Sequence, residues 1–281
     1  MLRTVLVPQI GVDTDKQSLA TAYEWLRENG GHLECLYVHD DAAAIASCIQ
    51  TDAMGVPVVT PQLLTVLNEE AKAEKAKARQ AFDAFCTTHG IATEAPVGAI
   101  SASWQAADAD VVATISAQGR YHDATFLARG LSATDLGTIA ISSGRPLILV
   151  PANRKPRPPA RIAIAWKETS EAAHAVTAAL PLLKRAETVT IFTVTESSDA
   201  HASRRAAHAC ARYLKQHDID AESSHLEAGD KSASSVLLSE AAGADLLIMG
   251  AYGHSRLREL VFGGFTREIL SGGEMPVFLM H

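Results

Sequence analysis

The sequence lacks the surplus of positive charge with which proteins bind nucleic acid or an anionic membrane. Its 281 residues contain 25 lysines and arginines against 32 aspartates and glutamates, so the formal net charge is −7. A chain with this balance has no general attraction for a phosphate backbone or an acidic lipid surface. We therefore expect neither nucleic acid nor a membrane among its partners.

Long apolar stretches and paired cysteines are also missing. The first residues, MLRTVLVPQIG, do not form a secretory signal, and no apolar run approaches the roughly 20 residues that span a bilayer. Four cysteines stand apart, without a C-x-x-C pair: Cys35, Cys48, Cys86 and Cys210. This pattern favours reduced, buried thiols over disulfides or a zinc site. We expect a cytoplasmic protein.

The common motifs of catalysis and nucleotide binding are absent as well. The chain has no G-x-x-x-x-G-K-[ST], and no G-x-G-x-x-G opens a helix after the first predicted strand. No serine has a recognisable histidine base. His201 and His208 lie seven residues apart on a predicted helix, but no carboxylate or cysteine completes a metal site. The sequence predicts no catalytic residue and no metal ligand.

The sequence does contain one pattern written twice. The two copies share apolar segments, which pair as RTVLVPQ (3–9) with RIAIAWK (161–167), ADVVATIS (109–116) with ADLLIMGA (244–251), and GRPLILVPA (144–152) with GEMPVFLMH (273–281). Strand-like runs at 32–40 and 188–196 alternate with helical segments near 63–89 and 201–217. Such alternation indicates a parallel sheet covered on both faces. We predict an α/β protein of two tandem doubly wound domains.

The segment PANRKPRPPAR (151–161) separates the two copies. It contains four prolines and four basic residues, and proline continues neither a helix nor a central strand. We predict a domain at 1–152, a solvated, semi-rigid linker at 153–160 and a second domain at 161–281. The first copy is longer mainly through residues 40–76, whose hydrophobic loop MGVPVV offers packing between domains or cover over a cleft.

A glycine-rich stretch, GAYGHSRLRELVFGGFT (250–266), follows a predicted strand and precedes a helix expected near Phe265. Loops beyond the carboxyl ends of parallel strands, and helix N-termini, offer unpaired amides to anions. Glycine allows the backbone to approach such a ligand closely. Two groups would hold phosphate from opposite sides: Gly250 and Gly253, and Gly263 and Gly264 with the Thr266 hydroxyl. His254 adds a polar contact.

The spacing G-x2-G-x9-G of Gly250, Gly253 and Gly263, together with MGAYGHSRLREL, resembles the universal stress proteins. This resemblance implies an adenine nucleotide alpha hydrolase-like fold, with a five-stranded parallel sheet per domain in the order 3-2-1-4-5. It implies pairing of the two domains through the fifth strands, Leu147 to Val150 and Val277 to Met280, and either a compact monomer or a homodimer of such pairs.

Some members of the family bind ATP at the glycine loop. The cofactor-binding residues that we expect on this basis are Gly250, Gly253, His254, Gly263, Gly264, Phe265, Thr266, Ala165 and Val194. The chain departs from the ATP-binding members at Gly264, where serine or threonine is usual, and at Lys167, where aspartate is usual. In the first half, Ile10 stands near the aspartate position and the glycine spacing is missing, so this domain is expected to be degenerate.

The sequence thus predicts a stress-response regulator whose second domain binds ATP or a related adenine nucleotide. No residue set supports fast turnover, so hydrolysis of ATP is expected to be slow at most. The alternative is an interaction module that binds no nucleotide and uses the fold, with its fifth-strand edge, for dimerisation.

Overall fold

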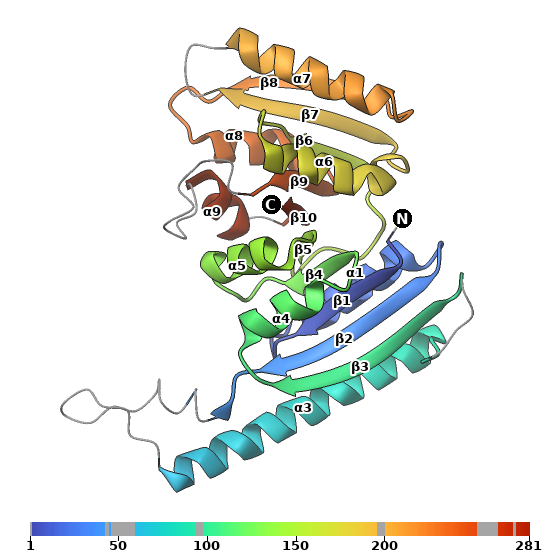
Figure 1. The fold of residues 1–281 in the computed structure, drawn as a ribbon, viewed down its shortest axis with the longest axis vertical. Coiled ribbons are helices and arrows are strands. Elements are labelled where there is room, and N and C mark those ends of the chain that lie inside the picture. Colours follow the sequence, from blue (N-terminus) through green and yellow to red (C-terminus); the bar gives the residue numbers. More distant parts are fainter. Residues whose placement is uncertain are drawn as a thin grey trace, which may run out of the picture.

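The chain forms one continuous sheet with helices on both faces (Figure 1). The computed structural model describes residues 2–42, 45, 60–93, 98–195, 200–251, 264–271 and 274–281. The N-terminal half contains β1 (Thr4–Gln9), α1 (Asp15–Leu26), β2 (Gly31–His39), α3 (Pro61–His89), β3 (Ile100–Asp108), α4 (Val111–Gly119), β4 (Ala124–Ala128), α5 (Ala133–Ser143) and β5 (Leu147–Val150).

The C-terminal half repeats this order of elements. It contains β6 (Arg161–Ala165), α6 (Ser170–Leu183), β7 (Thr188–Thr195), α7 (Ala200–Lys215), β8 (Glu222–Glu227), α8 (Ala233–Glu240), the short 3₁₀ helix η1 (Ala241–Gly243), β9 (Leu246–Gly250), α9 (Gly264–Ser271) and β10 (Val277–Met280). Cys48 and the predicted loop at 54–59 lie outside the described residues.

The ten strands run in the order β3-β2-β1-β4-β5-β10-β9-β6-β7-β8. Within each half the order is 3-2-1-4-5 and every pairing is parallel, which confirms the order that the family resemblance implied. The halves join where β5 pairs antiparallel with β10, with Ile148 opposite Phe278. The two five-stranded sheets are thus joined into one mixed sheet of ten strands. As a result, neither β5 nor β10 is an exposed edge strand.

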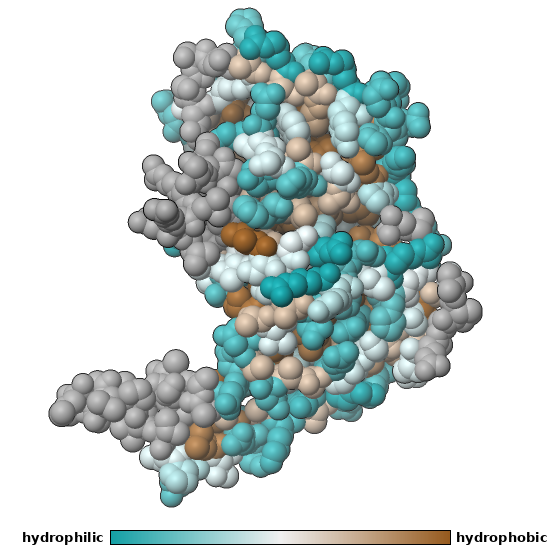
Figure 2. All heavy atoms as spheres, viewed as in Figure 1, coloured by the Kyte–Doolittle hydropathy of each residue, from teal (hydrophilic) through white to brown (hydrophobic). Residues whose placement is uncertain are grey.

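Two apolar clusters lie on the two faces of this sheet. Val5 and Val7 of β1 point into the cluster under α1, α3, α6 and α7, whereas Leu6 points into the cluster under α4, α5, α8 and α9. This alternation follows from the two-residue period of a strand. The surface in Figure 2 is largely hydrophilic, with hydrophobic residues in separate small areas. The apolar residues of the inner strands β1, β4, β5, β9 and β10 are thus buried on both faces, as predicted, whereas the outer strands β3 and β8 are partly exposed.

One of the predicted repeat pairs is wrong. Residues 111–119 form helix α4, capped by Asp110, whose carboxylate accepts a hydrogen bond from the amide of Ala113 at 2.6 Å. The strand equivalent to β9 is β4, and Asp123 occupies the position of Asp245. Each of these two carboxylates accepts hydrogen bonds from two backbone amides at the start of the first strand of its half. A short apolar run does not distinguish a strand from a helix.

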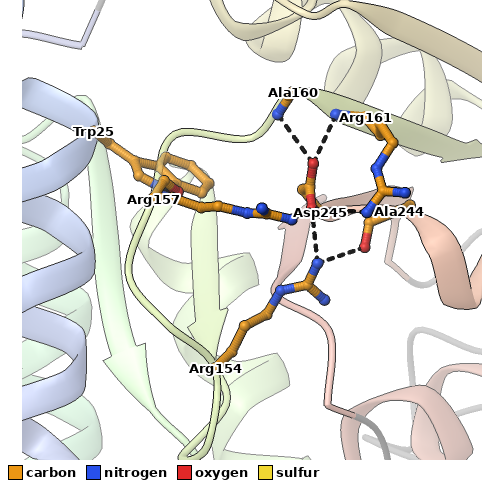
Figure 3. Close-up of polar contacts among 7 residues, drawn as sticks. All are labelled: Trp25, Arg154, Arg157, Ala160, Arg161, Ala244 and Asp245. Atoms are coloured by element: carbon orange, nitrogen blue, oxygen red, sulfur yellow. Dashed lines mark hydrogen bonds and ion pairs between the residues drawn. The ribbon is translucent and has the colours of Figure 1, made fainter.

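The segment between β5 and β6 is not a solvated linker, because its arginines bind Asp245 (Figure 3). One oxygen of this buried carboxylate accepts hydrogen bonds from Arg154 at 2.9 Å, from Arg157 and from Arg161 at 3.5 Å. The other accepts from the amides of Ala160 and Arg161. Burial alone would raise the pKa of Asp245, but these hydrogen bonds outweigh it and hold the pKa at about 2.

The same segment also binds the N-terminal half, through helix α1. The indole N–H of Trp25 donates to the carbonyl oxygen of Arg157 at 2.9 Å, and Gln17 donates to that of Arg154. Carbonyl groups of the segment thus face α1 while its guanidinium groups face β9. The domain limits at 152 and 161 remain a prediction, but the residues between them are fixed to both halves.

Candidate functional site

The candidate site lies at the carboxyl ends of β6, β7 and β9, beside the first turn of α9 (Figure 1). Strand β9 ends at Gly250 and α9 begins at Gly264, so thirteen residues connect them. The start of the predicted helix near Phe265 is confirmed. Three predicted site residues, Gly253, His254 and Gly263, lie outside the described residues.

Gly250 has a packing role that the sequence did not reveal. A Cβ atom at this position would lie 2.4 Å from the backbone nitrogen of Ala172 and 2.5 Å from the carbonyl carbon of Glu171. Side chains do not tolerate such distances, so the first turn of α6 approaches the end of β9 only because residue 250 is glycine. The need for glycine here is explained without a ligand.

The N-terminus of α6 is occupied by groups of its own. Thr169 caps the helix by accepting from the amide of Ala172 at 3.3 Å. Burial of Glu171 would raise its pKa, but its own backbone N–H and the hydroxyls of Thr169 and Ser170 lower it overall, with help from the charge of His281. A carboxylate at this helix end repels a phosphate group. Of the two helix ends near β9, that of α9 is therefore better suited to an anion.

Among the described residues, the first turn of α9 leaves room at Gly264. Apart from its neighbours in the chain and the backbone of its own helix, no described heavy atom lies within 4 Å of a Cβ built on Gly264. Phe265 is partly buried and Thr266 is buried. The amides of the first helical residues have no acceptor within their own helix, and they carry the positive end of the helix dipole. This end of α9 is suited to an anion.

An apolar margin, formed by Ala165, Val194 and Phe265, lies on the face of the sheet that α9 covers. Ala165, Val194 and Phe265 are each partly buried and pack against the same apolar cluster, on the sheet face covered by α8 and α9. The structure thus places three predicted site residues on one side of the sheet. Trp166, which follows β6 directly, packs against the cluster on the opposite face of the sheet.

The N-terminal half lacks the space for a comparable loop. Only four residues, 129–132, connect β4 to α5, whose cap is Ser132. A Cβ on Gly130 would lie 3.1 Å from the side chain of Val12 and 3.3 Å from that of Ile10. The side chains after β1 thus lie against the loop after β4, which agrees with a degenerate first half.

Sequence reasoning missed Asp15, which lies next to this region. One of its carboxylate oxygens accepts from the amides of Gly11 at 2.9 Å and Val12 at 3.1 Å. The other is buried and has no hydrogen-bond partner among the described residues. Burial outweighs the amide hydrogen bonds and raises the pKa of Asp15 to about 6. Nothing in the segment GVDTDK distinguishes this aspartate from Asp13, because burial depends on how α1 packs.

In the part of the chain that the structure describes, no three His, Cys, Asp or Glu residues are grouped so that they could hold a metal ion. No helix among the described residues is long and apolar enough to cross a membrane.

Comparison with known proteins identifies the second half. Residues 159–281 match the model of the universal stress protein family. The whole fold is similar to that of a universal stress protein from Archaeoglobus fulgidus DSM 4304, with a TM-score of 0.65 and 14% identity over 99% of this chain and 95% of that one. It is also similar to a functionally unknown protein from Pseudomonas aeruginosa PAO1, with a TM-score of 0.54 and 13% identity over 99% and 92%. No curated protein matches the sequence.

Proposed function

We propose, from the match of residues 159–281 to the universal stress protein family, that the chain is a stress-response protein whose C-terminal half binds an adenine nucleotide. The observation that carries the proposal is the position of α9. Its N-terminus follows the glycine-rich stretch at the carboxyl end of β9, and α9 covers the same face of the sheet as the apolar margin of Ala165, Val194 and Phe265. A nucleotide needs this combination, because its base is apolar on both faces and its phosphates are anionic.

We assign the binding residues as two groups. The phosphate groups would lie against the glycine stretch and the start of α9, and the base against the apolar margin. The first group contains Gly250, Gly253, His254, Gly263, Gly264 and Thr266, and the second contains Ala165, Val194 and Phe265. When bound, ATP would supply its own phosphoanhydride chemistry, while the chain binds and orients it.

Hydrolysis of ATP at this site would be slow. The carboxylate described beside the site belongs to Glu171, and hydrogen bonds at the start of α6 lower its pKa. A carboxylate that is stabilised in its ionised form is a weak general base. The proposed role is therefore that of a nucleotide sensor, and a turnover rate of tens per second would contradict it.

The alternative is an interaction module without a nucleotide. Lys167 in place of aspartate and the short loop of the N-terminal half favour it. In this chain β5 and β10 pair with each other, so a dimer of two chains would need a surface other than the fifth strands.

Calorimetric titration with ATP and AMP, with and without magnesium, distinguishes the two candidates. Wild-type protein, checked first for nucleotide retained through purification, is compared with Gly263→Val and with Gly243→Val, a glycine at the opposite ends of the strands. We expect one nucleotide per chain, lost in Gly263→Val and kept in Gly243→Val. No heat at millimolar ligand, together with no retained nucleotide, would reject nucleotide binding and favour the interaction module.

A further inference from the structure

Arg129 belongs to the N-terminal half but makes its hydrogen bonds in the C-terminal half. It follows β4 directly, and its guanidinium reaches the end of α9, which lies beside α5 across the junction (Figure 1). One terminal nitrogen donates to the carbonyl oxygen of Leu270 at 2.5 Å and, more weakly, to that of Ile269 at 3.4 Å. The other donates to that of Met275 at 3.4 Å.

These acceptors include the carbonyls that α9 itself leaves unpaired. The last four carbonyl oxygens of a helix have no donor within the helix, and a cation at this end is favoured by the helix dipole. Partial burial lowers the pKa of Arg129 below its usual value, yet a guanidinium stays charged at any physiological pH. A partly desolvated charge is costly without partners, so this contact ties Arg129 to the end of α9.

The helix that Arg129 holds is short and fixed along its length. Eight residues span about 12 Å, so its two ends move together. Ile269 and Leu270 are buried in the apolar cluster between α9 and the sheet. Glu268 accepts hydrogen bonds from the hydroxyls of Ser232 at 3.0 Å and Ser234 at 2.5 Å, at the start of α8. A change at the carboxyl end of α9 would therefore alter its amino end, at Gly264.

The two halves are not equivalent at this position. Ala128 pairs with Val150 at the end of β4, and Gly250 pairs with Met280 at the end of β9, so the counterpart of Arg129 is Ala251. Alanine has no side chain that could reach the other half. The N-terminal half thus contributes the side chain of Arg129 to the C-terminal half. At the equivalent position, the C-terminal half contributes no such contact to the N-terminal half.

We propose that Arg129 is a positioning residue for the nucleotide site, through which the N-terminal half sets the orientation of α9 and of the amides at its start. This inference rests on the proposed function. It gives the degenerate half a role, which is to hold the helix that would bind phosphate. By linkage, loss of the contact lowers nucleotide affinity without removing any group that touches the nucleotide.

The test compares Arg129→Met and Arg129→Lys with a matched control, Arg185→Met. Arg185, just after α6, forms an ion pair with Glu28, just after α1, so the control also removes a contact between the halves, but away from α9. ATP affinity is measured by calorimetry at a temperature at which every variant is folded, and hydrogen exchange is followed at the amides of 264–271. We expect Arg129→Met to weaken binding about tenfold and to speed exchange in α9, Arg129→Lys to recover part of both, and Arg185→Met to change neither.

The outcomes separate the inference from the function on which it rests. If wild-type protein binds ATP and Arg129→Met binds it equally well, the positioning role is wrong and nucleotide binding stands. If Arg185→Met weakens binding as much as Arg129→Met, the effect is one of general stability and the inference fails. If wild-type protein binds no nucleotide, both fail. Should Arg129→Met not fold, Arg129→Lys decides by the same comparison.

Discussion

The end of β9 and the first turn of α6 meet at Gly250 and Ala172, where a Cβ on Gly250 would lie 2.4 Å from the backbone nitrogen of Ala172. Gly250→Ala should lower the free energy of unfolding by about 1–3 kcal/mol, because backbone must shift to admit the methyl group. Urea denaturation measures this loss. Gly264→Ala is the matched control, since the described residues leave open space there. Equal stability of Gly250→Ala and wild type would show that the packing explanation is wrong.

Gly264→Ser should strengthen ATP binding without destabilising the protein. Serine or threonine is usual at this position in ATP-binding members of the family, and a hydroxyl at the start of α9 could donate to a phosphate oxygen. One such hydrogen bond contributes about 0.5–1.5 kcal/mol, or roughly twofold to twelvefold in affinity. Calorimetry on Gly264→Ser and Gly264→Ala separates the hydroxyl from the added bulk. Equal affinities in the two variants would place the phosphates elsewhere.

Asp245→Asn should weaken the junction at neutral pH and matter less in acid. The folded-state pKa of about 2 lies below the usual 3.8, so the carboxylate stabilises the fold fully above about pH 4 and loses this effect as the pH falls towards 2. The contribution is at most about 2 kcal/mol, because Arg157 and Arg161 are half exposed and screened by solvent.

Denaturation of wild type and Asp245→Asn between pH 7 and pH 2 tests that dependence. Asp123→Asn is the control, because Asp123 accepts hydrogen bonds from the two equivalent backbone amides in the N-terminal half, those of Arg3 and Thr4. A stability difference between wild type and Asp245→Asn that stays constant over this range would rule out ionisation of Asp245 as its source.

Asp15→Asn should show the opposite dependence on pH. The folded-state pKa of about 6 lies above the usual 3.8, so wild-type protein loses stability as the pH rises from about 4 to about 6 and the buried carboxylate ionises. Asparagine keeps an acceptor for the amides of Gly11 and Val12 but carries no charge. We expect the variant to be more stable than wild type by about 1–3 kcal/mol at pH 8 and similar near pH 4. A variant less stable than wild type at pH 8 would contradict the assigned cause.

Local patterns in the sequence determined most of the secondary structure. The branched apolar runs at β2 and β7 predicted strands, and the start of α9 after the glycine stretch was predicted within one residue. These features depend on side-chain period and on residues close in sequence, which single stretches express. The strand order within each half, and the meeting of Leu147–Val150 with Val277–Met280, followed from the resemblance to a family. For the predicted nucleotide site, the structure gives the positions of the described residues, whereas their role in binding stays a prediction.

Only the tertiary structure decided the contacts between distant residues. Residues 109–116 were paired with 244–251, which contain β9, but residues 111–119 form α4, because a short apolar run suits either element and its packing selects one. The arginines of the connecting segment became partners of Asp245 once β9 lay beside β6. In the same way, Arg129 met the end of α9 when β5 paired with β10. Local sequence determined most elements of this protein, whereas α4 and the contacts that join the halves were decided by packing between segments far apart in the chain.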